Sequence, residues 1–246
     1  MNFVWTENPD RLADRAAVIV AGLLREKPDA AIALPTGSTP LGMYRALVDL
    51  KRSGEFSCEA AHFFNLDEFS GKSIRDPQSY AAFLWTHFFS PLGVDPAQVR
   101  LLDGNAADPK EECRAFEEAI DAVGGLDLVI LGLGRNGHVA FNEPGSDWKA
   151  RTRQVPLTAE TRDAQRVLYD DPRDVPTSGL TMGIPTILSA RSILLLVSGE
   201  GKTAAVEALL RGAPDIERSV TAILGHPSLT VLADEALRPS RNVFAA

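Results

Sequence analysis

Residues 128–146 read LVILGLGRNGHVAFNEPGS, and this stretch decides the fold class that the sequence predicts. Residues 128–131 form an unbroken apolar run, which is typical of a strand buried on both faces of a parallel sheet. Open sheets of this kind bind ligands in the loops that follow the carboxyl ends of their strands. The stretch therefore predicts a central strand with a ligand-binding loop directly after it.

The loop after this strand combines glycine with groups that can move protons. Gly132, Gly134 and Gly137 allow sharp turns and a close approach of the backbone to a ligand. His138 and Glu143 follow, and an imidazole beside a carboxylate can serve as an acid/base pair. A histidine in a loop is more often structural or solvated than catalytic, so this interpretation depends on the strand exit that the two residues share.

The three glycines also match the G-x-G-x-x-G pattern of dinucleotide-binding sites. That pattern belongs in the first strand-to-helix turn of a domain, with an acidic residue about 20 positions later. Here it lies past the middle of the chain and continues into His-Val-Ala-Phe-Asn-Glu. We therefore do not expect a dinucleotide.

Composition excludes several classes of protein. The chain has 246 residues, is 45% hydrophobic and carries a formal net charge of −8, so it can bury a full core and lacks the basic character of nucleic-acid-binding proteins. Cys58 and Cys113 have no metal-ligand spacing and suggest no disulfide framework. We see neither a signal peptide nor an apolar run of about 18 residues. We expect a cytoplasmic protein without membrane or nucleic-acid partners.

Helix-like and strand-like segments alternate along the chain. This alternation predicts one domain over residues 1–246, an α/β fold with a doubly wound, mostly parallel sheet and helices on both faces. Residues 150–178 look less regular, and residues 179–189 look helical. The expected strands are 30–34, 62–66, 99–102, 128–131, 193–197 and 229–233. The first expected helix has Asn8 as its cap, Pro9 at its first position and apolar residues from 12 to 24 at helical spacing, and the last covers 202–211 and ends at Gly212. The other expected helices are 41–51, 79–89 and 109–123.

Two further strand exits carry polar residues that should meet the central loop at one edge of the sheet. Thr36, Gly37, Ser38 and Thr39 precede a helix, where free backbone N–H groups and the helix dipole make a phosphate site. An ordinary helix cap explains the same residues equally well. Asp67 ends an apolar strand, where its carboxylate would face the crevice, although adjacent acidic residues usually mark a solvated loop.

A fourth segment, residues 198–203, resembles a nucleotide-binding P-loop only partly. The P-loop needs a glycine where this chain has Leu196, so we do not expect a nucleotide. Lys202 opens a helix and can reach a phosphate as a point charge, unless it is simply a solvated surface lysine.

Taken together, these motifs resemble the glucosamine-6-phosphate deaminase family from about residue 30 to residue 237. The most specific block is His138 followed by Phe141-Asn142-Glu143-Pro144; the related 6-phosphogluconolactonases share the fold but typically carry a Ser-Leu-Phe-Pro type of sequence there. The matching segments are LPTGSTPLGMYRAL (34–47), FFNLDEFSG (63–71), LGLGRNGHVAFNEPGS (131–146), RTR (151–153), LTMGIPTIL (180–188) and GHPSLTVLADEAL (225–237).

The resemblance implies conversion of glucosamine 6-phosphate to fructose 6-phosphate and ammonia, without a metal or organic cofactor. His138, tuned by Glu143, would open the sugar ring, and Asp67 would remove the proton on C2. By the same resemblance, the phosphate would lie on the loop from Thr36 to Thr39, with Lys202 and, by a loose alignment, Arg166.

The sequence departs from the family at two informative positions. Asn136 stands where well-studied members carry Asp, and we expect it to hold the imidazole by a hydrogen bond without stabilising a positive charge on it. Val155 stands where allosteric hexamers regulated by N-acetylglucosamine 6-phosphate carry a lysine. We therefore expect no such allosteric site, and a monomer or small homo-oligomer.

Three alternatives stay open from the sequence. The substrate can be the galactosamine epimer, the enzyme can be a lactonase, or the chain can be a catalytically weak sugar-phosphate sensor. Asn136 alone motivates the sensor, and the attached DNA-binding domain that such sensors usually carry is not visible in the sequence.

Overall fold

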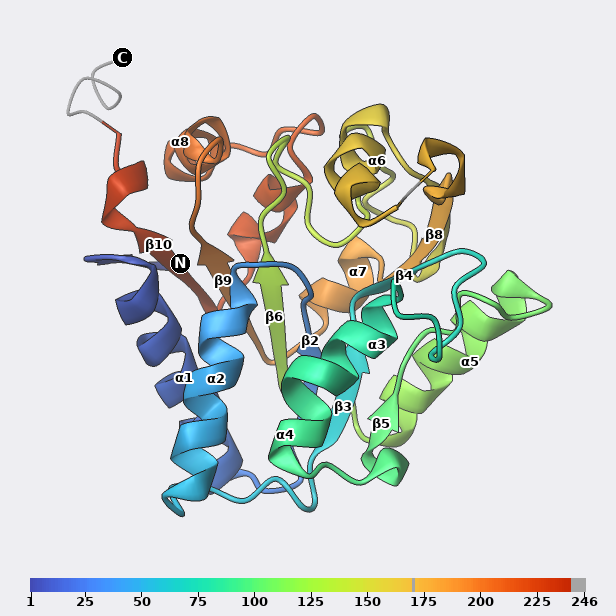
Figure 1. Cartoon of the computed structure of the whole chain (residues 1–246). Coiled ribbons are helices and arrows are strands. Elements are labelled where there is room, and N and C mark those ends of the chain that lie inside the picture. The colour runs from blue at the N-terminus through green and yellow to red at the C-terminus, as the bar shows by residue number, and fades with distance from the viewer. Residues whose placement is uncertain (170, 240–246) are drawn as a thin grey trace.

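A seven-stranded sheet lies at the centre of the computed structural model, which describes residues 1–169 and 171–239 (Figure 1). Each neighbouring pair of strands in it is parallel, which confirms the predicted doubly wound sheet. Across the sheet the strands are β1 (Asn2–Thr6), β10 (Leu229–Asp234), β9 (Ser192–Val197), β6 (Leu128–Gly132), β2 (Ala31–Leu34), β3 (His62–Asn65) and β5 (Val99–Arg100).

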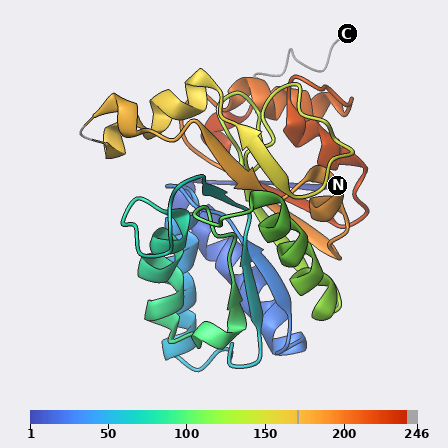
Figure 2. The same ribbon diagram turned by 90° about the vertical axis from the view of Figure 1, so that its right-hand side faces the viewer.

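Helices cover both faces of this sheet (Figure 2), because alternate strand residues point to opposite sides. Ile32 and Leu34 pack in one apolar cluster with residues of α1 and α2, whereas Ala31 and Ala33 pack in another with residues of α5, α7 and α8. The first face carries α1 (Pro9–Glu26), α2 (Pro40–Arg52) and a continuous helix made of α3 (Tyr80–Leu84), the π-turn η1 (Trp85–Phe89) and α4 (Ser90–Leu92). The second face carries α5 (Pro109–Ala122), α7 (Ile184–Leu188) and α8 (Thr203–Arg211).

The order of strands reverses between β2 and β6. From β2 the chain continues through β3 to β5 on one side, and from β6 it continues through β9 to β10 on the other. The loops that follow β2 and β6 therefore diverge from neighbouring strands, at the topological switch point where such sheets bind ligands. This arrangement brings the three predicted strand exits, those of β2, β3 and β6, to adjacent positions on one edge.

A second, antiparallel sheet of three strands lies beyond that edge, in the order β4 (Asp67–Phe69), β8 (Ser178–Thr181) and β7 (Arg153–Pro156). The predicted helix over residues 179–189 is wrong in its first half, because residues 178–181 pair with β4. A side chain at Gly179 would lie 2.6 Å from the Phe141 ring and 2.9 Å from the Glu68 carbonyl, so glycine here allows close strand packing.

Residues 150–178 are also more regular than we predicted. They contain β7, the short helix α6 (Ala159–Gln165) and two 3₁₀ turns, and α6 lies over the carboxyl edge of the large sheet (Figure 1). The 3₁₀ turns of the chain are η2 (Pro96–Gln98), η3 (Arg166–Leu168), η4 (Pro172–Asp174), η5 (Ser219–Gly225) and η6 (Glu235–Leu237).

Local signals placed several helix ends correctly. Asn8 caps α1 through a 2.9 Å bond from the Arg11 N–H, and Gly212 ends α8 in the left-handed region at φ 71°. Strand β1 was not predicted. It pairs with β10, which lies more than 200 positions away in the sequence. None of the helices in residues 1–169 and 171–239 is long and apolar enough to cross a membrane.

Candidate active site

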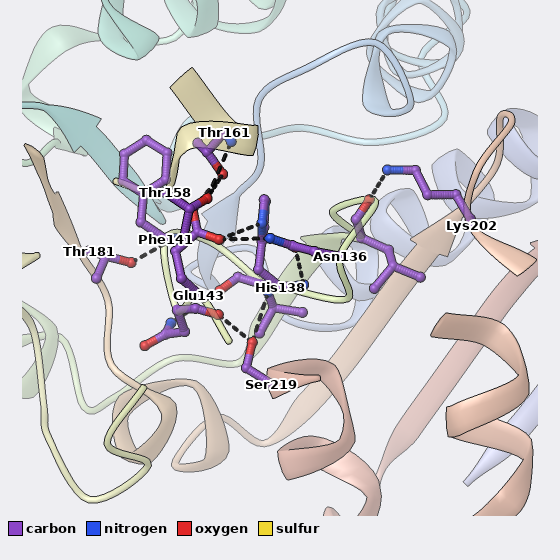
Figure 3. A network of polar contacts seen from close by, with 12 residues as sticks. Asn136, His138, Phe141, Glu143, Thr158, Thr161, Thr181, Lys202 and Ser219 are labelled. Carbon is purple, nitrogen blue, oxygen red and sulfur yellow. Dashed lines mark hydrogen bonds and ion pairs between the residues drawn. The ribbon is translucent and has the colours of Figure 1, made fainter. Parts of the chain in front are cut away.

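The loop after β6 folds back on itself and brings His138 beside Glu143 (Figure 3). The Asn142 N–H bonds the Val139 carbonyl at 3.1 Å, and Ala140 between them has φ 49°, the left-handed region that alanine rarely adopts. The resulting turn leaves Nδ1 of His138 3.2 Å from Oε2 of Glu143. The loop backbone therefore builds the predicted imidazole–carboxylate pair.

The His138 ring lies against Gly134. A Cβ atom at position 134 would fall 2.5 Å from the ring, so glycine is required for the ring to occupy this place. The Nδ1–Oε2 contact is an ion-pair contact and not a well-aligned hydrogen bond, since Nδ1 is buried without a partner in hydrogen-bond geometry. The His138 ring is thus held by its packing against Gly134 and by the neighbouring charge of Glu143.

Glu143 is buried, with 5% of its surface exposed, yet it is held in the ionised form. Burial alone would raise its pKa, but the contact with His138 and the hydrogen bonds from Thr161 and Asn136 lower the pKa of Glu143 to about 2. The Thr161 hydroxyl donates to Oε1, and the Asn136 amide donates to Oε2 at 3.0 Å. A carboxylate in this state can orient an imidazole and stabilise its protonated form.

Asn136 contacts the partner of the imidazole and not the imidazole itself. Its Oδ1 accepts the backbone N–H of His138 at 3.1 Å, while its amide donates to Glu143. The structure therefore corrects our expectation that Asn136 holds the ring. An amide can do both tasks at once, because it offers one acceptor and one donor group.

Asn142 anchors the loop to the rest of the molecule. It is fully buried, and its amide donates to the Met182 carbonyl at 2.8 Å and the Val139 carbonyl at 3.1 Å. Its Oδ1 accepts from Arg153 at 3.1 Å. These bonds fix the turn that precedes Glu143.

Asp67, the first residue of β4, is buried with 6% of its surface exposed. Burial raises the pKa of its carboxyl well above the usual range, and the negative charges of Glu68 and Glu143 raise it further. The rings of Phe69 in β4 and Phe141 in the loop after β6 lie with their centroids 5.2 Å apart, so the exits of β3 and β6 converge as predicted. An aspartate with a raised pKa is a stronger base than usual.

Tyr80, at the start of α3, touches all three strand exits. Its ring stacks on Phe69 with centroids 4.6 Å apart and on Phe141 at 5.7 Å. Burial and the charge of Asp67 raise the pKa of its phenol, which hydrogen bonding with Thr36 opposes. Tyr80 therefore joins the loops after β2, β3 and β6.

The loop from Thr36 to Thr39 has the properties of an anion site. Thr39 precedes α2 but makes no capping bond with its side chain, so the ordinary cap interpretation is not supported. Gly37 has φ 97°, and none of the N–H groups of Gly37, Ser38 or Thr39 donates to an acceptor in the described part of the chain. These donors point to a ligand at the start of a 13-residue helix.

Lys202 lies at the N-cap of α8, and its Nζ donates to the Leu133 carbonyl at 2.5 Å (Figure 3). Burial lowers its pKa, and the nearby positive charge of Arg135 lowers it further. Two cations therefore lie together beside the loop after β6, which favours an anionic ligand. Arg166, by contrast, is exposed on η3, and its guanidinium makes no hydrogen bond or ion pair with other described residues.

Three site residues escaped the sequence reasoning: Thr161, Tyr80 and Glu68. Thr161 lies in Thr-x-x-Thr at the start of a helix, a pattern that signals a cap and nothing about Glu143. Tyr80 follows Ser79, which caps α3, and the sequence at this position indicated only a helix rich in aromatic residues. Their roles depend on where tertiary packing brings α6 and α3.

Known proteins resemble the chain over almost its full length. The sequence profile of the family described as glucosamine-6-phosphate isomerases/6-phosphogluconolactonase matches residues 6–232. A glucosamine-6-phosphate deaminase 1 of Bacillus subtilis is 42% identical, covering 97% of this chain and 100% of its own. A glucosamine-6-phosphate deaminase of Thermoanaerobacter pseudethanolicus is 38% identical, covering 96% of this chain and 93% of its own.

Solved structures agree. A monomeric glucosamine-6-phosphate deaminase superposes with a TM-score of 0.93 at 40% identity, covering 97% of this chain and 100% of that one. A 6-phosphogluconolactonase of Thermotoga maritima superposes with a TM-score of 0.73 at 21% identity, covering 95% of this chain and 98% of that one, which shows a shared fold.

Proposed function

The chain belongs to the family of glucosamine-6-phosphate isomerases and 6-phosphogluconolactonases, and we propose that it is an enzyme that converts glucosamine 6-phosphate to fructose 6-phosphate and ammonia. The observation that carries this proposal is the pairing of His138 with Glu143 at 3.2 Å, together with the buried carboxylate of Asp67. The reaction needs one acid/base group for the ring and a second base for C2, and the site offers both.

Ring opening is the first step. It requires a base for the proton of the anomeric hydroxyl and an acid for the ring oxygen, and one imidazole can perform both transfers in turn. Nδ1 of His138 faces the carboxylate of Glu143, so this nitrogen carries the proton and Nε2 is left to exchange protons with the sugar. Glu143 stabilises the imidazolium that forms between the two transfers.

Isomerisation and loss of the amine follow. Asp67 takes the proton from C2 of the open-chain aldehyde, and the electrons of the broken C2–H bond form a C1–C2 double bond. The carbonyl electrons move to O1, which takes up a proton from solvent, so that an enolamine with a C1 hydroxyl results. A proton then returns to C1, which leaves an imine at C2. Water adds to this imine and ammonia leaves, so the product is the C2 ketone of fructose 6-phosphate.

The phosphate group is proposed to bind the N–H groups of Gly37, Ser38 and Thr39, with Lys202 as counter-charge. The free donors of the loop and the dipole of α2 support this position. Asn136 is proposed to serve the reaction by keeping Glu143 ionised and aligned. Arg166 stays a prediction as a phosphate ligand, because its place on η3 is exposed.

The test is release of ammonia and fructose 6-phosphate from glucosamine 6-phosphate, beside galactosamine 6-phosphate and 6-phosphogluconolactone as alternative substrates. We expect turnover of the gluco epimer and a loss of kcat of about 10²–10⁴-fold in Asp67→Asn, because a general base contributes that much. Asp121→Asn, an exposed position on α5, is the matched control.

Three results would contradict parts of this proposal. Turnover of the galacto epimer alone would keep the mechanism and change the substrate. Hydrolysis of the lactone without release of ammonia would reject the deaminase. Full activity in Asp67→Asn would remove Asp67 as the base.

We also propose that the enzyme acts in the cytoplasm as a monomer or small homo-oligomer, without activation by N-acetylglucosamine 6-phosphate. The buried, unpaired thiols of Cys58 and Cys113 suit a reducing compartment. Val155, where allosteric hexamers carry lysine, supports the lack of activation. Analytical sedimentation tests the oligomeric state, and saturation kinetics with added N-acetylglucosamine 6-phosphate test the lack of activation.

A further inference from the structure

The carboxylate of Glu143 receives donors from two separate parts of the chain. Asn136, in the same loop as His138, donates to Oε2, the oxygen that faces the imidazole. Thr161 reaches the other oxygen, Oε1, from α6, which is 18 positions further along the chain (Figure 3). The two oxygens are thereby held from opposite sides by different elements.

The direction of the Thr161 hydrogen bond is fixed by its neighbours. The Thr161 N–H donates to Oγ1 of Thr158 at 3.3 Å, which caps α6. The Thr158 hydroxyl in turn donates to Oγ1 of Thr161 at 3.2 Å. A hydroxyl has a single proton, and that of Thr161 goes to the carboxylate, which can only accept.

Resting on the proposed function, we propose that Thr161 is a positioning residue for the ring-opening pair: its hydroxyl occupies Oε1 of Glu143, so that Oε2 stays directed at Nδ1 of His138. Both residues are 5% exposed, so the bond forms inside the protein and little solvent can replace it. Thr161 acts through Glu143 and does not itself contact the reacting atoms.

This contact makes the ring-opening chemistry depend on α6. The helix lies over the carboxyl edge of the sheet and is connected to β7 of the small sheet, whereas His138 belongs to the loop after β6. When α6 is in place, the chain Thr158–Thr161–Glu143–His138 is complete. When α6 is displaced, Glu143 loses its donor on Oε1 and can rotate away from the ring.

The competing interpretation is that Thr161 only anchors α6. The two interpretations separate in Thr161→Val, which keeps the backbone N–H that donates to Thr158 and most of the side-chain volume, but removes the hydroxyl. Thr161→Ser restores the hydroxyl. Thr186→Val is a matched control, since the buried Thr186 hydroxyl donates to Glu117 at 2.6 Å on the far face of the sheet.

The experiment measures kcat and KM for glucosamine 6-phosphate across pH in these variants. We expect Thr161→Val to lower kcat about tenfold or more with a smaller change in KM, because bonds to charged groups are worth this much and this one serves the reacting state. The acid limb of the pH profile should stay in place, because Asp67, with its raised pKa, becomes protonated at higher pH than Glu143. Thr161→Ser should recover most of the activity.

A second readout needs no turnover. Titration of the Glu143 carboxyl by ¹³C NMR should show no protonation down to about pH 3 in the wild-type protein, where its pKa is lowered to about 2, and protonation at higher pH in Thr161→Val. The proposal is wrong if Thr161→Val shows an unchanged kcat and an unchanged carboxyl titration, with only the thermal midpoint lowered as in Thr186→Val. Absence of ammonia release from the wild-type enzyme would instead reject the proposed function, and the carboxyl titration would still decide the role of Thr161.

Discussion

At the scale of single residues, the environment of Asp67 depends on its neighbour Glu68. The Glu68 carboxylate is buried and accepts the N–H groups of Phe69, Tyr80 and Ala81 at 2.8–3.0 Å, which ties β4 to the start of α3. Burial nevertheless raises the pKa of Glu68 to about 7, against those hydrogen bonds. Near neutral pH, the charge beside Asp67 is therefore itself changing, and the two carboxyls titrate as a coupled pair.

Replacing Glu68 by Gln removes a negative charge from beside Asp67. We expect the pKa of Asp67 to fall, because like charge raises it. Since the proposed base works ionised, kcat/KM should begin its rise at lower pH than in the wild-type enzyme. The pH profile of kcat/KM measures this, and an acid limb at the original position would show that Glu68 does not act on Asp67. The buried amide should also cost about 1–3 kcal/mol of unfolding free energy, since it leaves a backbone donor unpaired.

At the scale of elements, the proposed phosphate site combines the loop before α2 with the N-terminus of α8. The loop precedes α2 and contributes uncapped N–H groups, and Lys202 at the N-cap of α8 contributes charge. In the proposed site, the neutral donors of the loop and the single cation of Lys202 bind the phosphate together.

Lys202→Met tests whether Lys202 supplies charge to the proposed phosphate site. We expect KM for glucosamine 6-phosphate to rise about 10–100-fold with a smaller change in kcat, because a charge-assisted contact to a group remote from the reaction is lost. Lys110→Met, at an exposed position on α5, is the control for charge alone. An unchanged KM, together with unchanged inhibition by inorganic phosphate, would place the phosphate elsewhere.

At the scale of the whole molecule, polar anchoring and the candidate site lie on opposite edges of the sheet. Asp127 precedes β6, is 3% exposed, and binds the N–H of Ala31 at 2.8 Å, Lys27 at 2.7 Å and Arg191. Burial raises its pKa, but these partners lower it overall. The ion pairs join the ends of α1, β6 and β9, at the edge of the sheet away from the candidate site.

Asp127→Asn should lower the unfolding free energy at pH 7 by about 1–3 kcal/mol, the worth of hydrogen bonds to a charged group, and leave kcat close to wild type. A lowered folded pKa stabilises the protein above the unfolded pKa of about 3.9 and does so less as pH falls through the lower folded value. The stability gap between variant and wild type should therefore narrow from pH 7 to pH 3 in urea titrations. A gap that stays constant would mean that the charge of Asp127 is not what stabilises the fold.

Local patterns predicted what depends on neighbours in sequence. The parallel sheet was predicted from the apolar run of β6, and helix ends were predicted from the cap at Asn8 and the glycine that ends α8. Because parallel strands end at the same edge of a sheet, His138 and Asp67 were predicted to lie on one edge. The failures depend on partners distant in sequence. Strand β1 exists because β10 offers an open edge, and residues 178–181 extend because β4 and β7 flank them.

The same reason explains the site residues that the sequence did not reveal. Nothing near Thr161 indicates Glu143, since their contact exists only once α6 is packed over the loop. Asn136 was noticed as a departure, but which groups its amide meets depends on the turn around Ala140. The residue types indicated the chemistry of the candidate site, whereas the contacts between its residues depend on the fold and could not be predicted.

The left-handed backbone at Ala140 has a consequence for the energy barrier. Holding a non-glycine residue at φ 49° costs about 1–3 kcal/mol, and the hydrogen bonds of the surrounding turn compensate for it during folding. The free energy needed to hold Ala140 in this conformation is therefore supplied when the chain folds, and no turnover of the enzyme requires it again. A sugar entering the site meets an imidazole and a carboxylate that already lie side by side, so little reorganisation energy of this loop remains to be added to the activation barrier.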